Sequence, residues 1–233
     1  MSDMMLLWLE IIFDVLYLVA IWTLVVIMWR KKDNLSEKNK KIGIIFLISF
    51  FLLALGDTGH VGFRVLAYAL GGIDGLDNYP VLVGLGALAT AVTVTFFYML
   101  VAEIWRLRFN KERNLVWWIL IIVGIVRLII MIPSGNSWGN VVPPLNWSLA
   151  RNIPLMIQGI GIAVLLLISG IKLEDKFAKT VSIFIFVSYA CYMPVIFFVQ
   201  KVPMLGMLMM PKTLAYVAIA ILALRLFNTK EKL

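Results

Sequence analysis

Seven long apolar stretches constrain this chain more than any other feature of its sequence. Roughly 20 helical residues are needed to cross a hydrocarbon core of about 30 Å, and each stretch is about that long. The stretches cover residues 5–29, 42–70, 81–105, 115–133, 152–171, 179–200 and 211–227. Because lipid leaves backbone polar groups without partners, these segments are expected to be helices and not strands. We therefore predict an all-α integral membrane protein, folded as a seven-transmembrane-helix bundle.

The composition agrees with a membrane protein that has no separate soluble domain. The chain is 62% hydrophobic and only 15% charged, with a mean hydropathy of +0.97. Soluble domains are nearer half apolar and a quarter charged. Residues 1–233 are accordingly expected to form a single transmembrane domain. The only cysteine, Cys191, excludes a disulfide within the chain.

The lysines and arginines predict the orientation of the bundle. Sixteen of the 21 lie in residues 30–41, 106–114, 172–179 and from Arg225 onward, which are the loops and end of one side. Basic loops stay in the cytoplasm, so the N-terminus is expected outside and the C-terminus inside. This distribution explains the net charge of +8 by topology and contact with anionic membrane lipids. It therefore predicts no nucleic-acid partner, and places the chain in a cell membrane, expected to be a bacterial or archaeal cytoplasmic membrane.

One loop on the predicted outer side is unusually long, at residues 134–150. It holds two tryptophans and the pair Pro143-Pro144. A loop of this length and composition predicts a packed cap or a shallow re-entrant segment. An ordinary interfacial loop with aromatic anchors is the alternative.

Ionisable residues inside the spans carry most of the functional information. Five bases fall outside the basic loops, namely Arg64, Arg127, Arg151, Lys201 and Lys212, and they are joined by Glu10, Asp14, Asp57 and the single histidine, His60. Each charge costs roughly 2.5–3.5 kcal/mol near the middle of a bilayer, so such groups face the bundle interior and pair. Counting along the helices puts nearly all of them in the outer half. They would either form ion pairs that lock the bundle or line an outward-facing cavity.

We favour the cavity, which would hold a small anionic or zwitterionic ligand or a lipid headgroup. Its net positive charge would attract a phosphate or carboxylate. Asp57 and His60 are the candidates for proton handling. The predicted ligand-binding residues are Asp14, Arg64, Arg127, Arg151, Asn152, Gln158, Tyr189, Tyr192 and Lys212.

Candidate functional residues are most concentrated in the segment Gly56-Asp57-Thr58-Gly59-His60. Residues three apart share a helix face, so Asp57 could orient His60 as a general base, or the two could form a structural pair. Gly56, Gly59 and Gly62 would let a neighbouring helix approach closely. Small residues along 84–95 are interpreted as helix packing alone, and the methionines of 204–210 as interfacial or lipid contacts.

Three function classes stay open at this point. The leading one is a proton-coupled transporter, because a mid-membrane aspartate beside a histidine can load and release protons. The second is a lipid hydrolase or acyltransferase with His60 as its base. The third is a receptor or accessory subunit with a purely structural charge network. No cofactor and no metal centre is predicted, and the oligomeric state is left open.

Overall fold

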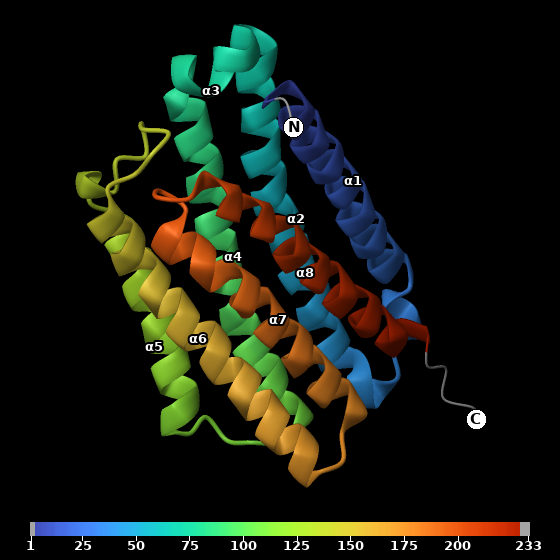
Figure 1. Ribbon diagram of the computed structural model, residues 1–233. Helices are drawn as coiled ribbons and strands as arrows, with labels where there is room; N and C mark the ends of the chain where they lie inside the picture. Colours follow the sequence, from blue (N-terminus) through green and yellow to red (C-terminus); the bar gives the residue numbers. More distant parts are fainter. Residues whose placement is uncertain (1–2, 229–233) are drawn as a thin grey trace.

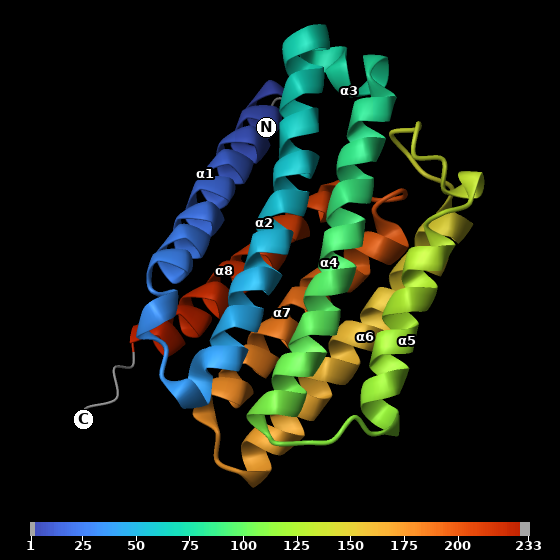
Figure 2. The same ribbon diagram turned by 180° about the vertical axis from the view of Figure 1, so that it is seen from behind.

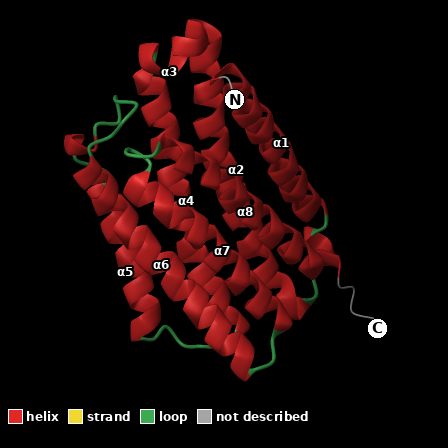
Figure 3. Ribbon diagram, viewed as in Figure 1, coloured by secondary structure: helices red, strands yellow, loops and turns green. Residues whose placement is uncertain are grey.

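The computed structural model describes residues 3–228, with side chains from Trp8 onward, and this part of the chain is helical apart from its loops (Figure 3). The α-helices are α1 (Asp3–Arg30), α2 (Glu37–Gly71), α3 (Gly75–Asn78), α4 (Pro80–Arg108), α5 (Leu115–Ile130), α6 (Leu145–Lys172), α7 (Lys176–Phe198) and α8 (Met209–Leu224). Short 3-10 turns include Ser134–Asn136 and the six-residue η4 (Pro203–Leu208). Six helical segments are long and apolar enough to cross a membrane, which indicates a multi-pass membrane protein.

Each predicted apolar stretch is helical, but several boundaries differ from the prediction. α5 has 16 residues and ends at Ile130. It stops there because Pro133 follows, and helical geometry is disfavoured for the residue that precedes a proline. α6 begins at Leu145, seven residues earlier than expected, directly after Pro144. The irregular segment is therefore 131–144, which we call the cap segment. Lys230 and Lys232, counted among the basic residues of the C-terminal end, lie outside the described residues.

The helices form two layers that close into a ring. Figures 1 and 2 show α1, α2, α4 and α5 side by side in one layer, with α6, α7 and α8 packed against it. The ring closes where α1 meets α8 and where α5 meets α6. Loops after α1, α4 and α6 gather at one end with the basic residues, which we call the basic end. At the opposite end α1, α2 and α4 extend beyond the second layer, and η4 lies partway along α2 and α4 (Figure 1).

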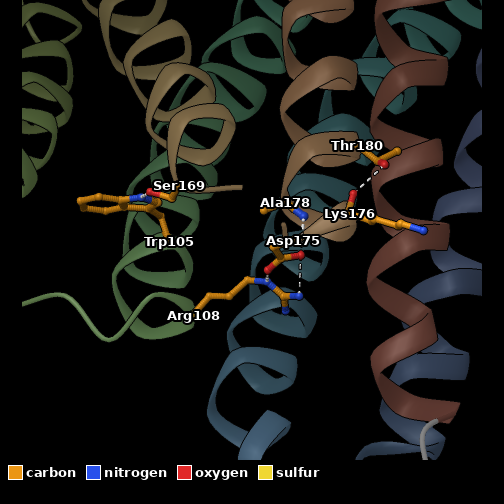
Figure 4. Close-up of polar contacts among 7 residues, drawn as sticks. All are labelled: Trp105, Arg108, Ser169, Asp175, Lys176, Ala178 and Thr180. Carbon is orange, nitrogen blue, oxygen red and sulfur yellow. Dashed lines mark hydrogen bonds and ion pairs between the residues drawn. The ribbon is translucent and has the colours of Figure 1, made fainter. Parts of the chain in front are cut away.

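The basic end is fastened by polar contacts between α4 and the turn that joins α6 to α7 (Figure 4). The guanidinium of Arg108 binds the carboxylate of Asp175 through Nε at 2.5 Å and Nη2 at 3.0 Å. Asp175 also caps α7 by accepting from the main chain of Ala178. Nearby, the indole of Trp105 donates to Ser169 at 3.0 Å. These contacts tie three helices together at this end.

Close packing of α2 on α4 explains two of the three predicted glycines. A Cβ on Gly56 would collide with Thr93, and one on Gly59 would lie 3.1 Å from Ala89. From the α4 side, a Cβ on Gly86 would lie 2.9 Å from the Cα of His60. Gly62 has open space around it, so the prediction that it admits a neighbouring helix is wrong. Positions three residues apart are offset by about 60° around an α-helix. Gly62, six residues after Gly56, therefore lies on the exposed face of α2.

Large apolar side chains fill the half of the bundle nearer the basic end. Phe46, Phe50, Phe97 and Phe227 are fully buried there, and Phe50 and Phe97 meet edge to face at 5.4 Å between ring centroids. Isoleucines from α4, α6, α7 and α8 complete this packing. Dense interiors of this kind leave few voids that could hold water.

Candidate functional site

A cavity of about 830 Å³ lies between the two layers, toward the end opposite the basic end. Its walls come from α1, α2, α4, α5, α6, α7, η4 and α8. Every predicted site residue except Gln158 lines it: Asp14, Asp57, His60, Arg64, Arg127, Arg151, Asn152, Tyr189, Tyr192 and Lys212. Charged residues that are distant in sequence thus share one cavity.

Asp57 is held by two neutral donors from neighbouring helices. Its Oδ2 accepts from the hydroxyl of Tyr17 on α1 at 2.5 Å, and its Oδ1 from Thr90 on α4 at 2.6 Å. Its carboxylate therefore has a partner on each oxygen. Neither partner is His60, whose Nδ1 is buried without a hydrogen bond among the described residues. The expected Asp57–His60 pair does not form, because the carboxylate turns toward α1 and α4.

Arg64 is the cavity arginine that forms an ion pair, and its partner is Glu10 on α1. The side chain of Glu10 is 43% exposed and that of Arg64 is 21% exposed, so the pair lies at the rim. This pair joins α1 to α2 and matches part of the expected charge network. Asp14, one turn further along α1, has no ion pair within the described part of the chain, and it faces the same cavity.

Among the described residues Arg127 is the most deeply buried charge, with only 2% of its surface exposed. Its Nε donates to the carbonyl of Arg151 at 2.8 Å, and its Nη1 donates to the carbonyl of Ala91 at 2.5 Å and to the hydroxyl of Thr95. No carboxylate pairs with it among residues 8–228, and none of these bonds uses Nη2. A buried guanidinium held by neutral acceptors keeps its full positive charge at the cavity wall.

Arg151 and Lys212 rest on aromatic rings. The guanidinium of Arg151 lies 4.4 Å from the ring centre of Trp138 and donates to Asn136 at 3.2 Å. The ammonium of Lys212 lies 4.3 Å from the ring centre of Tyr192. Cation–π contacts orient a charge without neutralising it. Both bases therefore remain available to an anion in the cavity.

Tyrosines and an amide complete the polar wall. The hydroxyl of Tyr192 donates to the side-chain oxygen of Asn152 at 3.1 Å, and that of Tyr189 donates to the carbonyl of Leu155 at 2.8 Å. Beneath them, the hydroxyls of Tyr98 and Tyr216 are 2.8 Å apart. Tyr189, Tyr192 and Tyr216 form the floor of the cavity, and Tyr98 lies behind Tyr216, toward the apolar packing of the basic end.

The cap segment covers the cavity over α4, α5 and α6. Asn136 is fully buried and donates to the carbonyls of Ile130 and Pro133 at 2.7 and 3.1 Å. The indole of Trp138 donates to the carbonyl of Met131 at 3.1 Å, and its main chain lies directly on Gly84. The cap segment is therefore packed against α4, α6 and the end of α5.

Gln158 lies below the cavity and does not contribute to it. It is fully buried, and its Nε2 donates to the carbonyl of Leu120 on α5 at 3.1 Å. It shares a helix face with Arg151, as its spacing predicted, but two turns place it about 10 Å deeper. Its contact with Gly124 indicates a packing role between α5 and α6.

Several residues of the site were not predicted from the sequence. Tyr17 follows Asp14 by three residues, so the shared helix face was a signal that could have identified it. Thr90 and Thr95 were assigned to packing alone, whereas they bind Asp57 and Arg127. Threonines that stand among small residues on one helix show the same sequence pattern whether they pack against a neighbouring helix or bind a charged side chain.

The chain matches no known family model, no curated protein and no solved structure. Within residues 8–228, no group of three histidine, cysteine or acidic side chains is arranged to hold a metal ion. The function proposed below therefore rests on the chemistry of the cavity.

Proposed function

We propose that this chain is a seven-span membrane protein, with its N-terminus outside the cytoplasm, that binds a zwitterionic molecule or lipid headgroup in an outward-facing cavity. The basic end would lie in the cytoplasm, because it carries most of the lysines and arginines. The cavity lies toward the opposite end, and would then face outward. The 16-residue α5 would be the seventh span, shortened by the cap segment that follows it.

The separation of charge across the cavity is the observation that carries the proposal. The unpaired acids, Asp14 and Asp57, come from α1 and α2, whereas Arg127 and Arg151 come from α5 and α6, and Lys212 comes from α8, which contacts α1 and α2. Within the described residues no ion pair joins the two groups. A ligand with an ammonium at one end and a phosphate or carboxylate at the other would complement both sides.

Arg127 supplies the strongest single reason to expect an anion. A buried charge without a counter-ion is costly, and neutral carbonyls compensate for only part of the lost hydration. Its Nη2 would be free to donate to a phosphate or carboxylate oxygen beside Arg151 and Lys212. Asp14, which forms no ion pair within the described residues, would accept from the ammonium, and the negative charge of Asp57 in the same cavity would stabilise it.

Binding of a water-soluble zwitterion tests this proposal directly. Glycerophosphoethanolamine would be titrated into the purified chain in detergent, and the melting temperature followed by tryptophan fluorescence. We expect saturable stabilisation that weakens at least tenfold in Asp57→Asn and in Arg127→Met. Glu103→Gln is the matched control, because Glu103 pairs with Arg106 near the basic end at 2.6 Å. Equal responses in all three variants would contradict a charge-separated site.

Catalysis by His60 is a second candidate, favoured by its unpartnered Nδ1 in the cavity wall. As a base it would act without help from Asp57, which is bound to Tyr17 and Thr90. His60→Gln separates the two functions, since it would abolish turnover of a lipid substrate but preserve binding. Transport would require a second conformation that opens the apolar half near the basic end.

A further inference from the structure

We infer that the ligand is a zwitterionic lipid, and that its acyl chain leaves the cavity sideways between the first half of α1 and η4. This inference rests on the proposed function, and it adds the ligand class and the route of entry. A water-soluble ligand and a lipid share the headgroup chemistry of the cavity. They differ in what the rim of the cavity must look like.

The rim between α1 and η4 is apolar and exposed. Leu9 on α1 is 46% exposed, and Met204 and Met207 of η4 are 74% and 42% exposed, yet all three line the same cavity as the charges. Phe13, Met209 and Met210 continue this lining inward. We call these six residues the portal. Flexible methionine side chains suit a surface that adapts to an acyl chain.

The other sides of the cavity mouth are built differently. Over α4, α5 and α6 the cap segment is packed down, with Trp138 on Gly84 and Asn136 buried. The cap is also tied to the turn after α7, because Gln200 donates to the carbonyl of Pro143 at 2.9 Å. The α1–α2 side carries the Glu10–Arg64 pair. The apolar rim thus lies on the remaining side, between α1 and η4.

Continuity between the portal and the charged interior identifies the occupant. One cavity contains both an apolar opening and separated opposite charges, which match the two parts of a zwitterionic lipid. An apolar opening gives a small polar solute nothing to bind. A lipid could slide its headgroup in from the membrane without removing its acyl chain from an apolar surrounding.

Gly206 offers a clean way to block the portal. It lines the cavity, and a Cβ built on it would meet no atom within 4 Å. Gly206→Trp should therefore fold and fill the opening. Gly62→Trp is the matched control, since Gly62 also has open space around it but does not line the cavity. Met207→Trp serves as a second plug.

The test compares lysophosphatidylethanolamine with glycerophosphoethanolamine, which is the same headgroup without a chain. Native mass spectrometry of the full chain in detergent would measure one-to-one binding of each. We expect the lysolipid to bind at least tenfold more tightly. Either plug should weaken lysolipid binding at least tenfold and change headgroup binding less than twofold, whereas Gly62→Trp should change neither.

The outcomes separate this inference from the proposed function. Equal affinities for the two probes, or lysolipid binding that is unchanged in both plug variants, would overturn the lipid inference. If Asp57→Asn still weakened headgroup binding in that case, the zwitterion site would stand. If neither probe bound, or if Asp57→Asn had no effect on either, the proposed function itself would fail.

Discussion

Replacing Arg127 by methionine distinguishes a binding site from a structural lock. The guanidinium makes hydrogen bonds to the carbonyls of Arg151 and Ala91 and to the hydroxyl of Thr95. Hydrogen bonds to a charged group contribute about 1.5–3 kcal/mol each. Burying the charge without a counter-ion costs several kcal/mol in the opposite direction. The two contributions are similar in size, so we expect Arg127→Met to change the free energy of unfolding by less than about 2 kcal/mol.

Ligand binding should respond much more strongly than stability. Losing one charge-assisted contact to an anion costs about 2 kcal/mol, which raises the dissociation constant roughly 30-fold. Urea unfolding in detergent, with and without glycerophosphoethanolamine, measures both quantities on the same sample. Arg108→Met is the control, because it removes the half-buried pair with Asp175 at the basic end and should leave affinity unchanged. A loss of more than about 4 kcal/mol in the free energy of unfolding, with unaltered affinity, would refute this prediction and show that Arg127 has a structural role only.

Three further predictions concern the basic end, the cap and the topology. Burial acts to raise the pKa of Asp175, but hydrogen bonds from Arg108 and the main chain of Ala178 hold that pKa below its usual value. The stability that this carboxylate contributes is therefore present at neutral pH and lost as the pH falls. In unfolding titrations the free energy of unfolding of wild type should exceed that of Asp175→Asn by about 1 kcal/mol at pH 7, and the two should be equal well below about pH 4. Gly84→Ala would press on the main chain of Trp138, and should lower the free energy of unfolding by about 1–3 kcal/mol, whereas Gly62→Ala should be neutral or slightly stabilising. In a Cys191→Ala background, an impermeant maleimide should label Asp77→Cys but not Arg113→Cys in intact cells, and the reverse pattern would invert the proposed orientation.

Helix positions were predictable from the sequence because lipid solvation imposes a strong pattern. Long apolar runs are required wherever a helix crosses the membrane, and each predicted run is helical. The ends were less predictable, since polar turns such as Leu145–Arg151 extend α6 beyond its apolar run. The short α5 depends on a proline that follows it, which hydropathy alone does not weigh.

The residues that line the cavity were largely predictable, whereas their hydrogen-bond and ion-pair partners were not. Charged residues inside apolar runs are rare, so their positions alone identified most of the polar residues that line the cavity. Which group each charge binds depends on helix rotation and tilt, and these are set by packing that sequence spacing does not encode. The carboxylate of Asp57 consequently meets Tyr17 and Thr90 where a pair with His60 was expected.

The way in which the cavity charges are satisfied separates two explanations for their presence. A bundle that used charge only to fasten its helices would pair Asp57 with Arg127, since opposite charges neutralise each other most fully at low dielectric. Here Asp57 takes hydroxyl donors from α1 and α4, and Arg127 takes carbonyl and hydroxyl acceptors from α4 and α6. Such neutral partners fix the orientation of both groups, and within the described residues neither group is paired with an opposite charge. That arrangement is costly for an empty bundle and suited to one that a zwitterionic ligand completes, because the ligand then supplies both missing counter-ions.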